Sequence, residues 1–177
     1  MSSRDDEYTE YISTRMMSLR RTAYLLCQDW HRADDLVQAA ITKLYVHWTR
    51  ARTADHIDAY ARTVLVHEFL GERRSAWARR VSLDGQVTQA RADPAGYHDH
   101  DDLLDLRAAL AAVPPRQRAT LVLRFYCDLN VEQAAQVLGC SAGTVKSQTV
   151  KGLAALRRAL DPDPGPQPAG ERKTRHG

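Results

Sequence analysis

The sequence predicts an all-α protein made of two small helical domains joined by a flexible linker, with a helix-turn-helix in the second domain. Apolar residues repeat at helical spacing through most of the first 80 residues and again over residues 103–160. A stretch rich in Gly, Pro and polar residues separates these regions. No segment has the alternating pattern of a strand, and no internal repeat occurs.

The spacing of apolar residues in the first half predicts three amphipathic helices. The first runs from Tyr8 to about Gln28, and the second follows a break at residues 29–31, in the segment RADDLVQAAITKLYVHW. Asp34 and Asp35 are expected in the first turn of the second helix, where carboxylates favour the helix dipole. They could equally form an acidic docking edge for a basic partner, and the spacing leaves both interpretations open.

The third predicted helix, from about Ile57 to Arg74, leads into a basic segment with one aromatic residue, GERRSAWARR. Basic side chains interleaved with an aromatic ring can hold a phosphate backbone and stack on an unpaired base. A solvated helix end with Trp77 folded back on the core is the alternative. Taken without the second half of the chain, the segment favours that alternative.

The composition of residues 81–102 predicts an acidic, flexible linker. Between Val81 and Asp105 one arginine stands against six aspartates, a net charge of −5. The cluster HDHDD at residues 98–102 offers metal-binding side chain types. Adjacent residues in a flexible segment rarely converge on one ion, so we predict no metal site and no cofactor.

The second half begins with a predicted helix from Leu103 to Val113, which stops before Pro114. Pro115 can occupy the first turn of the next helix because its fixed φ is compatible with that position. We expect these inward-facing side chains: Leu103, Leu106, Leu110, Val113, Leu121, Val122 and Phe125.

The segment from Asn130 to Lys151, NVEQAAQVLGCSAGTVKSQTVK, predicts a helix-turn-helix. Asn130 and Gln133 have the spacing of a capping box. Gly139 follows the first helix where a positive φ is needed, and Ser141 can cap the second helix. Val145 can then fill the angle between the two helices.

The second helix of this motif presents a polar and basic surface that suits a DNA major groove. The expected surface residues are Thr144, Lys146, Ser147, Gln148, Val150 and Lys151. Between Leu106 and Leu160 eight basic residues stand against two acidic ones, a net charge of +6. An ordinary helical hairpin with a solvated face is the alternative, but the mutually consistent cap, turn and apolar plug favour DNA reading.

Composition argues against several other classes of protein. No apolar run approaches the roughly 20 residues that span a bilayer, and the acidic start does not resemble a secretory signal, so we expect a cytoplasmic protein. The three isolated cysteines predict free, partly buried thiols. No phosphate loop, nucleophile motif or acid/base pair predicts an enzyme. Residues 161–177 predict a disordered tail.

Taken in order, these motifs resemble the extracytoplasmic-function family of RNA polymerase sigma factors, and within it the actinobacterial SigE-like group. RADDLVQ resembles the family's polymerase-docking helix, AYARTVLVHEFLGERR its promoter-melting helix, and VPPRQRATLVLRFY with VEQAAQVLGCSAGTVKS its second domain. The resemblance implies a region 2-like domain over residues 1–80, a linker over 81–102 and a region 4-like domain over 103–160.

The resemblance also implies partners and contact residues. The partners are core RNA polymerase, promoter DNA (duplex at minus-35 and a melted strand at minus-10) and, from the family alone, an anti-sigma protein. The resemblance assigns polymerase docking to Asp34, Asp35, Leu36 and Gln38. The minus-10 contacts are Arg62, His67, Arg73, Arg74, Trp77 and Arg80. The minus-35 surface described above is joined by Arg116, Arg118 and Arg124, which would contact phosphates.

Two departures from the family concern base preference: His67 stands where many members carry Asn, and Lys151 where Arg is common. A LuxR-type helix-turn-helix regulator, which binds DNA without being a polymerase subunit, is the alternative function. It leaves RADDLVQ and the basic helix end unexplained. A third reading, a metal-dependent hydrolase that uses HDHDD, lacks any supporting catalytic motif.

Overall fold

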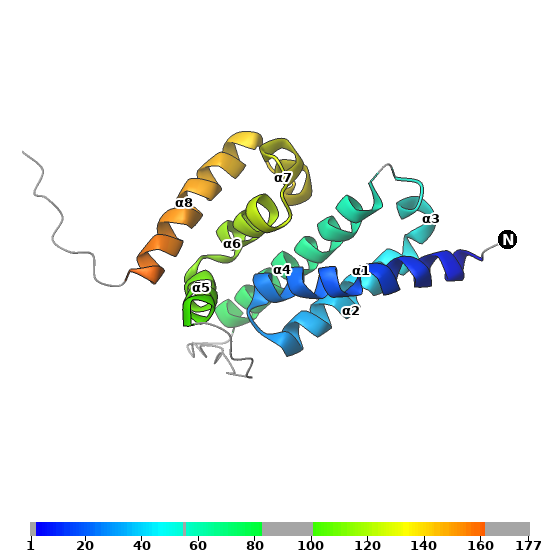
Figure 1. Cartoon of the computed structure of the whole chain (residues 1–177), viewed down its shortest axis with the longest axis horizontal. Helices are drawn as coiled ribbons and strands as arrows, with labels where there is room; N and C mark the ends of the chain where they lie inside the picture. The colour runs from blue at the N-terminus through cyan, green and yellow to red at the C-terminus, as the bar shows by residue number, and fades with distance from the viewer. Residues whose placement is uncertain (1–2, 55, 83–100, 162–177) are drawn as a thin grey trace, which may run out of the picture.

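The structure, a computed structural model, describes residues 3–54, 56–82 and 101–161, and for residues 73–82 and 101–104 it describes the backbone alone. Over these ranges the chain is helical, with one π-helical turn and no strand (Figure 1). The predicted all-α class is therefore confirmed. The predicted tail and the HDHDD side chains lie outside the described residues.

The first half contains four helices: α1 (Arg4–Cys27), α2 (Trp30–Val46), α3 (Trp48–Ala51) and α4 (Ile57–Ser82). Helices α1, α2 and α4 pack against one another. Leu26, Leu36, Leu65 and Phe69 are fully buried between them. Trp48, at the start of α3, is buried as well, which explains why the apolar pattern of α2 continues past its end.

The start of α2 differs from the prediction. The Asp29 side chain accepts a hydrogen bond from the backbone N–H of Arg32 at 2.9 Å, so it caps the helix and α2 begins at Trp30. The first turn of α2 therefore holds no carboxylate. The expectation that Asp34 and Asp35 stabilise that turn was wrong, because the helix begins one turn earlier.

The second half contains α5 (Asp101–Ala112), α6 (Pro115–Leu121), the π-helical turn η1 (Val122–Tyr126), α7 (Val131–Leu138) and α8 (Ala142–Leu160). Pro115 occupies the first position of α6, as predicted. Helix α8 packs against α5, α6 and α7. The close approach of α8 to α6 depends on Gly152, because a Cβ there would lie 3.1 Å from Leu121.

The π-helical turn η1 changes the register of the helix that leads to the helix-turn-helix. Its wider i→i+5 spacing rotates the following side chains relative to an α-helix. Phe125, which was expected to face the core, is 61% exposed, and the neighbouring Tyr126 is 48% exposed. Leu106 on α5 is also exposed, contrary to the prediction.

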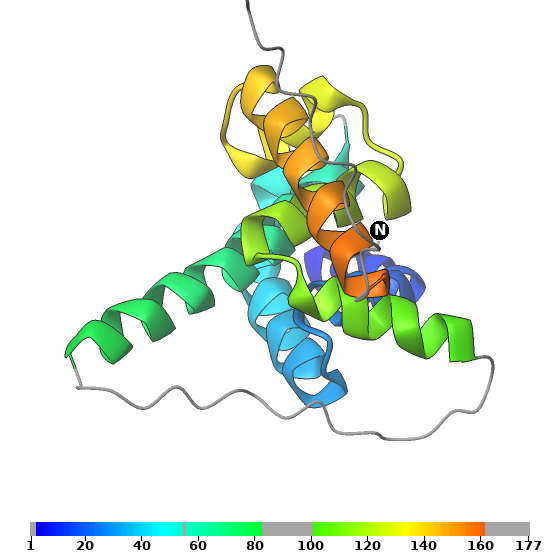
Figure 2. The ribbon, with the colours of Figure 1, turned by 90° about the vertical axis from the view of Figure 1, so that its left-hand side faces the viewer.

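The two halves pack against each other. Helix α4 contacts α7, and α1 contacts α5, α6 and η1. Buried apolar side chains from both halves form one continuous core. Figure 2 shows the end of α4 projecting away from these contacts. The helices extend slightly into the expected linker, because α4 continues through Ser82 and α5 begins at Asp101.

Candidate nucleic-acid interface

The first helix of the helix-turn-helix is α7, and its N-terminus is held by the predicted capping box. The backbone N–H of Gln133 donates to Oδ1 of Asn130 at 2.8 Å, and the N–H of Asn130 donates to Oε1 of Gln133 at 2.9 Å. Both residues use their side chains to satisfy N–H groups that a helix start leaves unpaired.

The turn between α7 and α8 also forms as predicted. Gly139 has a φ of 63°, a left-handed conformation that costs glycine little. The N–H of Thr144 donates to Oγ of Ser141 at 3.1 Å, which caps α8. Val145 is fully buried, so it fills the angle between the helices.

Four residues form the exposed stripe of α8: Lys146, Ser147, Val150 and Lys151. Val150 is 69% exposed, which gives the stripe an apolar tip that could meet a thymine methyl group. The other two predicted residues are less available. Thr144 lies 2.9 Å from Ser141 through their hydroxyl oxygens, and Gln148 is only half-exposed.

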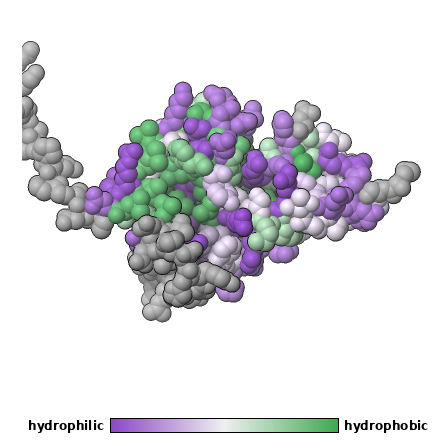
Figure 3. Space-filling view, viewed as in Figure 1, coloured by the Kyte–Doolittle hydropathy of each residue, from purple (hydrophilic) through white to green (hydrophobic). Residues whose placement is uncertain are grey.

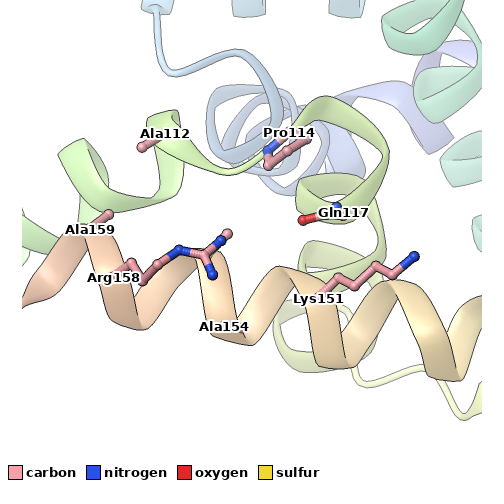
Figure 4. Close-up of a pocket in the computed structure, with 8 residues that line it drawn as sticks. Ala112, Pro114, Gln117, Lys151, Ala154, Arg158 and Ala159 are labelled. Carbon is pink, nitrogen blue, oxygen red and sulfur yellow. The ribbon is translucent and has the colours of Figure 1, made fainter. Parts of the chain in front are cut away.

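Lys151 also borders a cleft of about 550 Å³ between α8 and the adjoining α5 and α6 (Figure 4). The cleft is lined by Ala112, Pro114, Gln117, Lys151, Ala154, Ala155, Arg158 and Ala159. Gln117 and Arg158 are polar or charged, so Lys151 stands where the basic stripe meets a flank of mixed character. Figure 3 shows that hydrophobic surface gathers over the second half of the chain on the face drawn there.

Of the three arginines predicted to contact phosphates, only Arg116 is exposed. Arg118 is 4% exposed, and its guanidinium donates to the carbonyls of Val113 (2.9 Å) and Leu26 (2.7 Å), among others. Assigning Arg118 to a phosphate contact was therefore wrong for this structure. Its charge is held by helix C-terminal carbonyls, where a cation is favoured.

Arg124 is half-buried and partly committed to the fold. Its Nη1 donates to the carbonyl of Leu129 at 2.6 Å, just before α7, and its guanidinium lies 5.9 Å from the centre of the Phe125 ring. This arginine positions the entry to the helix-turn-helix.

Two of the predicted minus-10 residues, Arg62 and His67, lie on the part of α4 that faces the second half. Arg62 lines a cleft of about 820 Å³ whose opposite wall includes Gln133 and Gln136 of α7. His67 Nε2 lies 2.8 Å from the carbonyl oxygen of Val137. The side chains of Arg73, Arg74, Trp77 and Arg80 lie outside the described residues, although the backbone there is helical.

The predicted docking residues on α2 differ in their solvent exposure. Asp35 and Gln38 are exposed, whereas Leu36 is 1% exposed and belongs to the core. Leu36 was therefore wrongly assigned to polymerase contact, because its place on α2 faces α1 and α4. Asp34 is paired with Arg20, and the hydrogen bond from that guanidinium lowers the pKa of the carboxyl group.

Sequence reasoning missed an aromatic and cationic stack beside this docking edge. Tyr24 and Trp30 stack with ring centres 4.1 Å apart, Arg20 lies over Trp30, and Arg107 of α5 lies over Tyr24. No helical periodicity points to this cluster, because it joins α1, α2 and α5. The ring of Tyr24 thereby carries a contact between the two halves.

A second missed feature is an apolar groove of about 470 Å³ that both halves line. Leu25 of α1 contributes from the first half, and Leu106, Phe125 and Leu156 are among the residues from the second. The change of register at η1 exposes Phe125 to this groove. Exposed apolar surface of this kind is typical of protein contacts.

The cysteines are free, with Cys27 buried and Cys127 and Cys140 half-buried, as predicted. Burial raises the pKa of the Cys27 and Cys127 thiols, which keeps them protonated at neutral pH. Among the described residues no group of His, Cys, Asp and Glu is placed to hold a metal ion. No helix in those ranges is long and apolar enough to cross a membrane.

Two family matches coincide with the two halves. Residues 14–79 match sigma-70 region 2, and residues 109–158 match sigma-70 region 4. The region 2 match covers α2 and most of α1 and α4, and the region 4 match covers the helix-turn-helix.

Whole-chain relatives agree with these matches. The chain is 35% identical over 158 residues to the RNA polymerase sigma-E factor of Streptomyces coelicolor, covering 87% of this chain and 86% of that protein. It is 32% identical over 145 residues to the ECF RNA polymerase sigma factor SigL of Mycobacterium tuberculosis, covering 80% and 82%. Among solved structures, it matches the sigma factor RpoE of Bartonella quintana, in complex with the anti-sigma factor NepR, with a TM-score of 0.74, 26% identity and coverage of 89% and 98%. The chain therefore belongs to the extracytoplasmic-function family of RNA polymerase sigma factors.

Proposed function

We propose that this sigma factor binds core RNA polymerase through the exposed edge of α2 and directs it to promoters that α4 and α8 recognise. The observation that carries the proposal is the joint presence of both sigma-70 regions, one with Asp35 and Gln38 exposed on α2 and the other with an exposed basic stripe on α8. A LuxR-type regulator is not favoured, because it offers no account of region 2.

On the DNA, α8 would read the minus-35 duplex through Lys146, Ser147, Val150 and Lys151. Arg116, at the start of α6, would hold a phosphate and fix the register without reading sequence. The part of α4 that begins at Arg62 would contact the minus-10 strand. Stacking of an unpaired base on an aromatic ring such as Trp77 would offset part of the cost of opening the duplex.

We assign the apolar groove around Phe125 to a protein partner. We propose an anti-sigma protein as this partner; the solved structure of the similar Bartonella sigma factor contains one, NepR. The sigma factor itself carries out no catalytic step in this proposal, and it works in the cytoplasm beside the polymerase that does the chemistry.

The test is transcription by bacterial core RNA polymerase on a genomic template, with and without the purified protein, followed by mapping of transcript starts. We expect new, discrete start sites that share minus-35 and minus-10 sequences. The LuxR-type alternative expects promoter binding by the chain alone and no association with core polymerase in gel filtration. Absence of new start sites would overturn the proposal.

A further inference from the structure

The cleft beside α8 holds charged side chains that no ion pair within the fold neutralises. Its lining includes Lys151 and Arg158 of α8 and Gln117 of α6, and it contains no carboxylate. Among the described residues neither cation is ion-paired, and the Gln117 amide has no hydrogen-bond partner. Asp161, the carboxylate nearest to Arg158 along the chain, is exposed and unpaired as well. The cleft therefore carries positive charge that a ligand can use.

Several other cations in the described residues are already committed to the fold. Those of the first half that form an ion pair are Arg15, Arg20, Lys43 and Arg52. In the second half, Arg118 and Arg124 donate to backbone carbonyls. Arg158 has no such partner, although it borders a cleft. Its position therefore favours contact with a ligand over a structural role.

Arg158 leans toward the DNA-reading end of α8. Side chains of an α-helix tilt toward its N-terminus. Figure 4 shows the Arg158 side chain running along α8 in the direction of Lys151, with Gln117 on the opposite side of the cleft. Small side chains, Ala154 and Ala155 among them, line the space beside these groups, so a ligand can approach the helix closely. The donors of Arg158 and Gln117 therefore face one space at the end of the basic stripe.

The position of Arg158 along α8 matches the edge of a major groove. A recognition helix contacts base edges with its N-terminal residues. From Lys146 to Lys151 the rise is about 7.5 Å, which fits a groove about 8.5 Å deep. Arg158 lies seven positions beyond Lys151, about 10 Å farther along the helix. When Lys151 reaches a base, Arg158 is therefore level with the sugar–phosphate backbone beside the groove.

We propose that the cleft binds a backbone phosphate of the promoter beside the minus-35 element, with Arg158 and Gln117 as its donors. A guanidinium can hold two phosphate oxygens at once, and the Gln117 side-chain N–H can donate to one of them. This contact fixes the register of α8 without reading sequence, whereas Lys151 reads a base. The DNA partner rests on the proposed function, and the unpaired donors in the cleft rest on the structure alone.

A double-mutant cycle between protein and DNA tests this contact. Holoenzyme made from core polymerase and the full-length chain is titrated with promoter duplexes in which one phosphate at a time is replaced by a neutral methylphosphonate. At one position beside the minus-35 element, the neutral linkage should weaken binding by the parent holoenzyme about threefold to tenfold. The same linkage should weaken binding by the Arg158→Ala holoenzyme less than about twofold, because the contact is already absent.

Arg157→Ala is the matched control, because Arg157 is the adjacent exposed cation and does not line the cleft. It should keep the sensitivity of the parent at every position. Gln117→Glu tests the other wall: it should weaken promoter binding more than Gln117→Ala, since it places a carboxylate beside the phosphate. Arg158→Ala should weaken binding equally on promoters with altered minus-35 bases. Full sensitivity of Arg158→Ala at every phosphate that the parent requires would overturn the proposal.

Salt titrations of the chain alone on duplex DNA need no polymerase. Arg158→Ala should reduce the slope of log affinity against log salt by about 1, and Arg157→Ala should reduce it by clearly less. If the chain keeps this difference but fails to bind core polymerase, the proposed function falls and the phosphate site stands. Binding of pyrophosphate at Arg158, seen as a shift of its side-chain NMR signal, without any coupled DNA phosphate would overturn the assignment to DNA.

Discussion

Arg20 and Asp34 form a two-point ion pair between α1 and α2, in which Nη2 lies 2.9 Å from Oδ2 and Nε reaches Oδ1. One of the two acidic residues expected to dock on polymerase is therefore already paired. Asp35, the next residue, is exposed. Adjacent carboxylates thus differ in the charge that they can offer a basic partner.

We expect Asp35→Asn to weaken binding to core polymerase by about twofold to fivefold, the range of an exposed ion pair. Asp34→Asn should have a smaller effect, because Arg20 already neutralises that carboxylate. Fluorescence anisotropy of the labelled protein with core polymerase gives both affinities. A larger loss with Asp34→Asn would assign docking to the paired residue instead.

The same ion pair predicts a pH dependence of stability. The hydrogen bond from Arg20 lowers the pKa of Asp34, so its stabilisation is fully present above the unfolded value of about 3.9 and is lost as pH falls through the lower folded value. Arg20→Gln should therefore lower the free energy of unfolding at pH 7 by only the small amount typical of an exposed ion pair, since both side chains are partly exposed. Urea unfolding at pH 7 and pH 3 measures the difference, which should be smaller at the lower pH.

Arg116 and Arg118 are two residues apart but should behave differently. Arg116→Ala should reduce the slope of log affinity against log salt for duplex DNA by about 1, because an exposed phosphate contact is removed. Arg118→Met should leave that slope unchanged and lower the free energy of unfolding by about 2 to 4 kcal/mol, since it leaves buried carbonyls without a donor. An altered slope in Arg118→Met would show that this arginine reaches DNA after all.

Gly139 and Gly143 make a matched pair on either side of Ser141. Gly139→Ala should destabilise the protein by about 1 to 2 kcal/mol, because φ is 63° there. Gly143→Ala should be neutral or stabilise by up to about 1 kcal/mol, since the position is helical and the nearest atom to an added Cβ is 3.8 Å away. Thermal unfolding of the two variants compares them directly.

Lys151→Ala should alter minus-35 preference or lower promoter affinity by about 1 to 3 kcal/mol. Arg157→Ala removes the same charge from the last turn of α8 and serves as the control. Run-off transcription across promoters with altered minus-35 bases separates the two effects. Identical profiles for Lys151→Ala and the parent protein would remove Lys151 from the reading surface.

What could be predicted from the sequence depended on local interactions. The capping box of Asn130, the turn at Gly139 and the cap at Ser141 involve residues within a few positions of one another, so their spacing sufficed. The buried position of Val145 followed from the same geometry. Exposure of Lys146 and Lys151 could also be expected, because charged residues on an amphipathic helix face solvent.

The remaining features depend on contacts between distant segments. Arg118 was expected to contact DNA because local spacing showed no partner for it within the protein. Its partner, the carbonyl of Leu26, lies 92 positions away in the chain. The outward position of Phe125 required the π-helical turn, which no residue pattern marks. Leu36 sat within a docking motif, yet the packing of α2 places it in the core. Docking of α7 on α4 is likewise a tertiary feature.

Trp30 stacks on Tyr24, and Arg107 of the other half lies over the same tyrosine ring. The stack therefore places an intrinsic fluorophore beside a contact between the two halves. Any motion that withdraws Arg107 changes the surroundings of Tyr24 and, through it, the indole of Trp30. Stopped-flow emission from unlabelled protein can therefore report whether Arg107 moves when polymerase is added, without chemical modification of the chain.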